Sequence, residues 1–128
     1  MPVAERQGVR LTKQVIRSRI LARLEKQKED VRSKKSNLIK EKLFRDKLFK
    51  QAKRVMFYIA LKGEVETKEM IEAALRLGKI IAVPVCLKKR VSLRPAILDE
   101  KTRLKKGPYG VCEPADSRYI AFKDLDLV

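Results

Sequence analysis

The chain has 128 residues and a formal net charge of +16, because it contains 32 Lys and Arg residues but only 16 Asp and Glu residues. This length suits one domain, and a hydrophobic content of 45% is enough to build a core. The sequence has no histidine, and Cys86 and Cys112 are far apart, which excludes a His-based catalytic triad and argues against a zinc site. The charge predicts anionic partners, such as nucleic acid, phosphorylated small molecules, polycarboxylates or an anionic membrane.

The apolar and aromatic content narrows these classes. An aromatic content of 5% disfavours a stacking platform for single-stranded nucleic acid. The N-terminal residues lack the apolar core of a signal peptide, and no apolar run is long enough to span a membrane. We therefore expect a cytoplasmic protein without a membrane partner.

The first expected element is an amphipathic helix over residues 6–27. Its apolar stripe consists of Ile16, Ile20 and Leu24. Lys13 and Arg17 each precede a stripe residue by one heptad, so both cations point into the apolar arc. Charges at such positions often mark functional sites, although a chain so rich in Lys and Arg also produces such pairs by chance.

A second helix is expected from Val31 towards Gln51, with Asp30 as its N-cap. Lys and Arg side chains are interspersed with apolar residues along it, and they most simply form a solvated face. A basic helix also suits contact with nucleic acid or a membrane surface, but Glu41 and Asp46 interrupt the run of positive charge.

The middle of the chain begins with an apolar run over Val55–Leu61, which predicts a strand buried on both faces. Gly63 ends this run, and Thr67 is a good N-cap for a helix over Lys68–Leu77. Two acids of the intervening loop are singled out by their place after the strand, namely Glu64 and Glu66. In open α/β sheets, ligands bind at the carboxyl ends of strands, so these acids are candidate ligand contacts. The alternative is that both are solvated loop residues.

A second apolar strand follows over Lys79–Val85, where Pro84 is expected at the strand end because proline has no N–H to donate. Strand, helix and strand with short connections form a βαβ unit and predict a parallel sheet in this part. A short strand over Ser92–Ile97 comes next. The apolar Leu125–Val128 stretch is typical of a strand beginning, from which we expect the sequence to continue.

These elements predict an α/β fold, a three-layer αβα arrangement with a mainly parallel sheet and the N-terminal helices packed on it. Residues 1–128 would form a single domain that is truncated at its C-terminal end. The sequence contains neither G-x-G-x-x-G nor G-x-x-x-x-G-K-[ST], and no acid cluster resembles a calcium loop. No metal ligand and no catalytic residue is identified. From the residues alone, the prediction is an α/β domain that binds an anionic ligand.

Several segments form an ordered set that extends over nearly the whole chain. They are Lys13-x-x-x-Arg17, Phe57-Tyr-Ile-Ala-Leu-Lys-Gly-Glu-Val-Glu-Thr67, Gly78-Lys-x-Ile-x-Val-Pro84, Tyr109-Gly-Val-Cys-Glu-Pro114 and Asp124-Leu-Asp-Leu-Val128. Each piece is weakly specific by itself. In this order and at this spacing, they resemble the 5-formyltetrahydrofolate cyclo-ligase family, also called methenyltetrahydrofolate synthetase.

The resemblance implies an ATP-dependent ligase of one-carbon metabolism. That family closes the ring of 5-formyltetrahydrofolate to give 5,10-methenyltetrahydrofolate, and it releases ADP and phosphate with Mg²⁺ present. Its accepted mechanism transfers a phosphoryl group from ATP to the formyl oxygen, after which N10 attacks and phosphate leaves.

The resemblance also assigns roles to residues of this chain. Lys13 and Arg17 would contact the ATP phosphates, where their charge offsets that of the triphosphate. Ile59 would line the folate pocket, and Glu64 would accept hydrogen bonds from the amino and ring N–H groups of the pterin. Tyr109 would stack against the pterin.

The sequence departs from the family in one respect. The family's glycine-rich ATP-binding segment, of the form G-x-G-x-G-x-Y-Y-D, is absent. We therefore expect this polypeptide alone to have little or no cyclo-ligase activity. We also expect it to be a monomer. The family pattern assigns only Glu64 to the ligand and leaves Glu66 as a structural acid near the helix start.

Two other functions stay open at this stage. One is a basic nucleic-acid-binding module that uses the Lys and Arg residues of positions 10–54, and the other is a catalytically inactive folate or nucleotide binder. Saturable binding of reduced folate would favour the enzyme, whereas tight RNA or DNA binding with a steep salt dependence would favour the nucleic-acid module.

Overall fold

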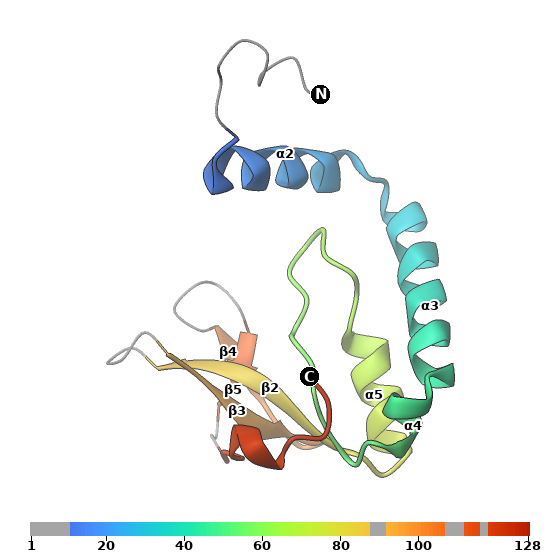
Figure 1. Cartoon of the computed structure of the whole chain (residues 1–128), viewed down its shortest axis with the longest axis vertical. Helices are drawn as coiled ribbons and strands as arrows, with labels where there is room; N and C mark the ends of the chain where they lie inside the picture. The colour runs from blue at the N-terminus through green and yellow to red at the C-terminus, as the bar shows by residue number, and fades with distance from the viewer. Residues whose placement is uncertain (1–10, 88–91, 107–111, 116–117) are drawn as a thin grey trace.

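A computed structural model of the chain describes residues 11–87, 92–106, 112–115 and 118–128 (Figure 1). The elements, in chain order, are α2 (Lys13–Lys26), α3 (Glu29–Arg45), α4 (Lys47–Gln51), β1 (Arg54–Met56), α5 (Lys68–Arg76), β2 (Ile80–Leu87), β3 (Ser92–Leu98), β4 (Leu104–Lys106), β5 (Cys112–Pro114) and the 3₁₀ turn η1 (Phe122–Asp124). The predicted α/β class is confirmed. Among the described residues, no helix is both long and apolar enough to cross a membrane.

The main sheet has three strands in the order β1-β2-β3, and it is mixed. β1 and β2 are parallel and are connected through α5, which confirms the predicted βαβ unit. β2 and β3 are antiparallel over their full length, so the sheet is not mainly parallel. The reason is the short connection between Leu87 and Ser92, because a parallel neighbour needs a crossover of a dozen or more residues. A second, two-stranded antiparallel sheet pairs β4 with β5.

Pro84 lies inside β2, opposite Pro95 of β3, so the prediction that it ends the strand is wrong. Pro95 O accepts a hydrogen bond from Ile120 N at 3.0 Å, so the backbone of Pro95 faces away from β2. Pro84 and Pro95 therefore form a pair that needs no hydrogen bond between the two strands, and neither proline interrupts the β2–β3 pairing. On the other side, Phe57 N–H donates to Ala82 O at 2.9 Å, and residue 84 would be the next donor. Pro84 therefore ends the β1–β2 ladder at Phe57, which frees the following residues to leave the sheet.

The core lies between the helices and the β1–β2 pair (Figure 1). Its buried members come from α4, β1, α5, β2 and the residues that directly follow α4 and β1: Phe49, Ala52, Val55, Phe57, Met70, Ile71, Ala74, Ile81 and Val83. Phe49 is central, because its ring packs against Phe44 at 4.7 Å and against Phe57 at 6.4 Å between ring centroids. The helices α3, α4 and α5 are thus anchored on the sheet by apolar packing.

The N-terminal helices differ in how they meet this core. α3 and α4 are two helices rather than the single one predicted, because Asp46 accepts hydrogen bonds from Leu48 N and Phe49 N and so begins a new helix. α2 has no buried residue and stands apart from the sheet (Figure 1), which corrects the prediction that it packs there. Its apolar stripe is flanked by cations and is too narrow to form a buried face.

The C-terminal residues lie beside β1, where the predicted strand beginning is present as a single isolated bridge and not as a strand. Leu127 forms a parallel bridge with Val55, and Leu127 O accepts a hydrogen bond from Met56 N at 2.9 Å. Asp126 Oδ2 accepts hydrogen bonds from the backbone N–H groups of Lys53 and Arg54, each at 2.9 Å. These two bonds lower the pKa of the Asp126 carboxyl, with the bond from Arg54 as the larger cause.

Candidate functional site

The loop after β1, residues 57–67, turns sharply at its tip. Gly63 has a φ of +93°, a left-handed conformation that side chains disfavour. Glu64 N–H donates to Leu61 O at 3.1 Å, and Leu61 N–H donates to Glu64 Oε1 at 2.6 Å. The Glu64 side chain therefore closes the turn that carries it, and its orientation is set by the backbone of the same loop.

Thr67 holds the base of this loop together. Its hydroxyl donates to Tyr58 O at 2.7 Å and accepts from Ala60 N–H at 3.2 Å. Thr67 occupies the N-cap position of α5, but its side chain makes no capping bond, so the predicted capping role is wrong. The hydroxyl instead joins the outgoing and returning arms of the loop, because β1 places Tyr58 and Ala60 within its reach.

Tyr58 adds a further bond across the loop. Its hydroxyl donates to Val65 O at 3.1 Å, so the phenol must keep its proton for this contact. Partial burial raises the pKa of Tyr58, and the nearby Glu64 carboxylate raises it further. The phenol is therefore a stable hydrogen-bond donor at neutral pH.

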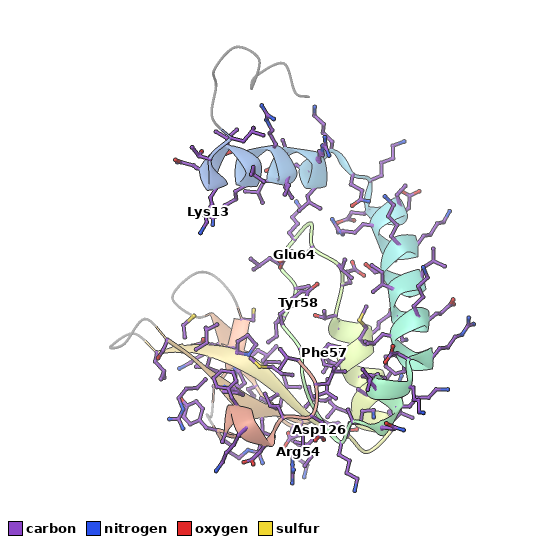
Figure 2. The ribbon with its side chains drawn as sticks, in the orientation of Figure 1. Lys13, Arg54, Phe57, Tyr58, Glu64 and Asp126 are labelled. Carbon is purple, nitrogen blue, oxygen red and sulfur yellow. The ribbon has the colours of Figure 1, made fainter. Side chains whose placement is uncertain are left out.

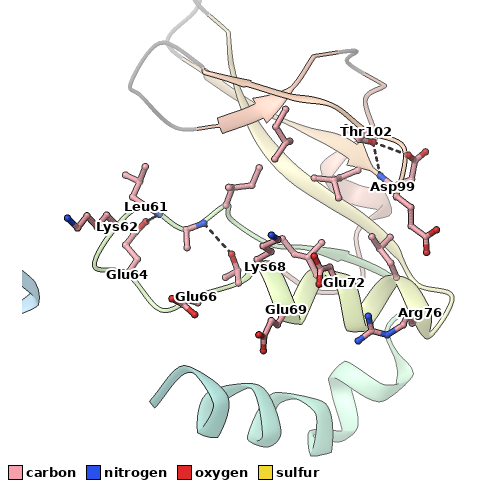
Figure 3. Close-up of a pocket in the computed structure, with 18 of the residues that line it drawn as sticks. Leu61, Lys62, Glu64, Glu66, Lys68, Glu69, Glu72, Arg76, Asp99 and Thr102 are labelled. Carbon is pink, nitrogen blue, oxygen red and sulfur yellow. Dashed lines mark hydrogen bonds between the residues drawn. The ribbon is translucent and has the colours of Figure 1, made fainter. Parts of the chain in front are cut away.

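A groove of about 820 Å³ opens between this loop, α5 and the segment that follows β3 (Figure 3). Its apolar floor is made by Ile59, Ala60, Leu61, Ile71, Leu75, Leu98 and Leu104. Its polar rim is made by Arg32, Lys62, Glu64, Glu66, Thr67, Lys68, Glu69, Glu72, Arg76, Asp99, Glu100 and Thr102. An apolar floor with a polar rim is the usual composition of a small-molecule site.

The rim is more acidic than the chain as a whole. Acidic side chains outnumber basic ones in the groove, whereas Lys and Arg outnumber Asp and Glu two to one in the sequence. The charge that predicted an anionic ligand therefore lies mostly elsewhere on the molecule. Carboxylates can only accept hydrogen bonds, so this rim suits the donor groups of a ligand.

The structure brings two of the predicted site residues, Ile59 and Glu64, to this one groove. Glu64 is half-buried, and its Oε2 makes no hydrogen bond with another described residue. Glu66 also lines the groove, two residues further along the loop. The loop acids are therefore at a concave surface, as their place after the strand predicted.

The predicted phosphate-binding residues lie elsewhere. Lys13 and Arg17 are exposed on the N-terminal half of α2, and Figure 2 shows Lys13 at its start. Neither lines the groove or forms an ion pair with a described residue. The other end of α2 does reach the loop, because a Cβ placed on Gly63 would lie 3.7 Å from Leu24 Cβ. Tyr109 lies outside the described residues.

The far wall of the groove was not predicted. Asp99 Oδ1 accepts hydrogen bonds from Lys101 N at 2.9 Å and from the Thr102 hydroxyl at 3.0 Å, and this turn fixes the segment after β3 (Figure 3). Arg118 also binds Asp99 and is the largest cause of the lowered pKa of that carboxyl. The only signal in the sequence was a polar, irregular stretch after an apolar strand.

The described residues contain no group of three or more His, Cys, Asp or Glu side chains arranged to hold a metal ion. Within the described ranges, no such group is present to hold the Mg²⁺ that the resemblance implies. Lys13 and Arg17, four residues apart on one helix and exposed, do fit an anionic ligand such as the phosphates of ATP.

Comparisons with known proteins bear on the family and the fold. The model of the 5-formyltetrahydrofolate cyclo-ligase family matches residues 9–128. A relative from Caenorhabditis elegans, described as a probable 5-formyltetrahydrofolate cyclo-ligase, is 27% identical over 77 residues, which cover 58% of this chain and 37% of that protein.

The fold also resembles a solved structure. The NMR structure of Aquifex aeolicus 5,10-methenyltetrahydrofolate synthetase superposes with a TM-score of 0.76 at 22% identity and covers 90% of this chain and 58% of that one. This neighbour shows the fold alone, and the chain spans only part of the length of both relatives. The match over residues 9–128 decides the family: this chain belongs to the 5-formyltetrahydrofolate cyclo-ligase family.

Proposed function

We propose that this chain forms the folate-binding part of an enzyme that cyclises 5-formyltetrahydrofolate to 5,10-methenyltetrahydrofolate, with ATP converted to ADP and phosphate. The observation that carries this proposal is the groove shared by Ile59 and Glu64, in a chain whose family is a cyclo-ligase family. The chain spans 37% of one relative and 58% of the other, so the activity of a whole enzyme comes to it only as part of this proposal.

Glu64 is the residue that would recognise the pterin. Its Oε1 is held by Leu61 N–H, which leaves Oε2 to accept a hydrogen bond from an amino or ring N–H group of the ligand. A carboxylate held by its own backbone turn is already oriented, so little entropy is lost when the ligand binds. Ile59 would supply the apolar surface beneath the ring.

Lys13 and Arg17 would hold the phosphates of ATP from α2, and Tyr109 would stack against the pterin. When bound, ATP would supply the phosphoryl group that activates the formyl oxygen. The two cations are exposed and separated by one helical turn, so both can reach the same anionic group.

The glycine-rich segment of the family is absent from these 128 residues. We therefore expect the purified polypeptide to bind reduced folate but to turn over little ATP by itself. A cytoplasmic location and a monomeric state are part of the same proposal.

The test is a calorimetric titration of the purified chain with 5-formyltetrahydrofolate. Glu64→Gln is the informative variant, because its side-chain oxygen still accepts from Leu61 N–H while its NH₂ group faces the donors of the pterin. We expect at least a tenfold loss of affinity, about the effect of losing one charged hydrogen bond. Glu41→Gln, an exposed acid on α3, is the matched control and should bind like the parent.

Two outcomes would overturn the proposal. One is a parent chain that shows no saturable binding of reduced folate. The other is tight binding of RNA or DNA with a steep salt dependence, which the nucleic-acid alternative requires. The family match gives no support to that alternative.

A further inference from the structure

The loop that carries Glu64 is tied to the rest of the molecule by one helix as well as by its own bonds. Within the loop, Thr67 and Tyr58 bond to backbone groups that lie seven to nine residues away. A separate bond comes from α3, where Ser36 Oγ accepts from Glu66 N–H at 3.0 Å, across 30 residues of sequence. This bond fixes the returning arm of the loop two residues from Glu64.

Ser36 is unusual on its own helix. α3 is mostly exposed, and Ser36, at 5% exposure, is its one buried residue. Polar side chains are seldom buried without a partner, and here the partner is Glu66 N–H. Helix and loop therefore meet closely at this point, and the hydroxyl satisfies a backbone donor that the loop cannot satisfy by itself.

Arg32 lies one turn before Ser36, on the same side of α3. Its side chain is only 11% exposed, lines the groove, and places Nη2 4.0 Å from Glu66 Oε1 and 3.3 Å from Glu29 Oε1. Its Nε is buried without a hydrogen-bond partner among the described residues. Such a donor is unfavourable by itself, so the two carboxylates and the surrounding packing must hold Arg32 in this position.

We propose that Ser36 and Arg32, which we call the α3 clamp, are positioning residues for the ligand-binding loop. Both act on Glu66, one through its backbone N–H and the other through its carboxylate. Through Glu66 they set the height of the Glu64 turn over the groove floor, although neither contacts the carboxylate of Glu64. Glu66 is thereby a link between helix and loop, while Glu64 stays available to a ligand.

The identity of the ligand in this proposal rests on the proposed function. The contacts of the α3 clamp with the loop are independent of that function. If the loop is held from α3, removing the Ser36 hydroxyl should loosen Glu66 and the turn at Glu64 while the core stays folded. Ser36 is not a member of the core cluster, and α3 contacts that cluster further along, through Leu43 and Phe44. A displaced Glu64 would then bind a reduced folate more weakly, because a positioned acceptor loses strength steeply with distance and angle.

The experiment compares Ser36→Ala with Ser33→Ala, an exposed serine three residues earlier on α3. Hydrogen exchange at the Glu66 amide, calorimetric affinity for 5-formyltetrahydrofolate and the melting temperature are measured for both variants. In Ser36→Ala we expect the Glu66 amide to exchange about three to ten times faster and the Kd to rise by a similar factor, as the loss of one hydrogen bond implies. Ser33→Ala should match the parent in both.

The outcomes separate the clamp from the proposed function. A parent that binds folate, with a Ser36→Ala variant of unchanged Kd, overturns the positioning role even if the melting temperature falls, because that pattern is purely structural. A Glu66 amide that exchanges no faster in Ser36→Ala overturns the clamp whatever the ligand result. If the parent binds no folate, the proposed function fails, and faster exchange at Glu66 alone still supports the clamp as the element that holds the loop.

Discussion

The two parts of the proposed site are built in different ways. The loop that carries Ile59 and Glu64 follows β1, is crossed by hydrogen bonds from Thr67 and Tyr58, and lines a groove. α2, which carries Lys13 and Arg17, has no buried residue and only its C-terminal end approaches the loop. One part of the site is therefore fixed by the fold, and the other is a helix whose position the core does not set.

This difference separates residues that only match a sequence pattern from residues whose positions the fold determines. The resemblance draws on residues of both segments. Only the loop is held in place by several hydrogen bonds, including one from α3. A side chain held by several independent bonds is positioned before the ligand arrives. Cations on an exposed helix supply charge without a fixed geometry, and their interaction is screened by salt. Substitutions in the core, the loop, the helix α2 and the C-terminal segment should therefore differ widely in their effects.

Removing a large core side chain should have the largest effect. Phe49 is 1% exposed and contacts two other rings, so Phe49→Ala should lower the free energy of unfolding by about 3–5 kcal/mol in urea titrations. Ile20→Ala on α2, where the side chain is 51% exposed, should change it by less than about 0.5 kcal/mol. A large loss in Ile20→Ala would show that α2 packs more firmly than its exposure indicates.

Two threonines provide the next comparison. Thr67→Val removes a hydroxyl that both donates and accepts inside the loop, and should lower the free energy of unfolding by about 1–3 kcal/mol. Thr12→Val removes the hydroxyl that accepts from Val15 N–H at the start of α2. It should increase hydrogen exchange within α2 and leave global unfolding almost unchanged, because no core residue depends on that helix. Equal effects on global stability would remove the distinction between the two parts.

Lys79 joins the helical part to the sheet. Its Nζ donates to the carbonyls of Phe49, Lys50 and Ala52 at the C-terminal end of α4, and it lies 4.8 Å from the centre of the Phe49 ring. Lys79→Met keeps the length of the side chain but removes the donors, and should cost about 1–2 kcal/mol of unfolding free energy. Lys47 is an exposed lysine of α4, so Lys47→Met is the control for the change of charge. It should leave the free energy of unfolding nearly unchanged.

The smallest effect is the pH dependence of the contact between Asp126 and β1. The pKa of this carboxyl is lowered in the folded chain, so its contribution is present above the unfolded value of about 3.9 and is lost as the pH falls through the folded value. The difference in melting temperature between the parent and Asp126→Asn should therefore be constant from about pH 7 to pH 5 and shrink below about pH 4. A difference that grows on acidification would contradict this assignment.

Local features of the sequence predicted much of the fold correctly. The βαβ unit followed from two apolar runs that flank an amphipathic segment, and positive φ angles occur at Gly63 and Gly78, where a turn and a helix end were expected. The same reasoning failed where a residue had two compatible local roles. Thr67 is a good cap by type, but its hydroxyl donates to Tyr58 O, which the chain after β1 brings beside it, and makes no capping bond.

Other features depend on which segments meet in space. Pro84 looked like a strand end because proline cannot donate, but its place opposite Pro95 removes the need for a donor on that side. The far wall of the groove and the contact between Ser36 and Glu66 join residues about 30 positions apart or more. Periodicity reports which side of an element is apolar, and it does not report which element will face that side.

For this protein, the sequence by itself determined the α/β class, the family and the loop in which Glu64 lies, because these follow from the order and spacing of residues along the chain. The tertiary structure decided that the sheet is mixed, that α2 is unburied and that the groove is acidic in a basic chain. It also decided that α3 holds the loop at Glu66. The physical reason is that hydrogen bonds and charges act over a few ångströms, so partners distant in sequence become defined only when the core brings them together.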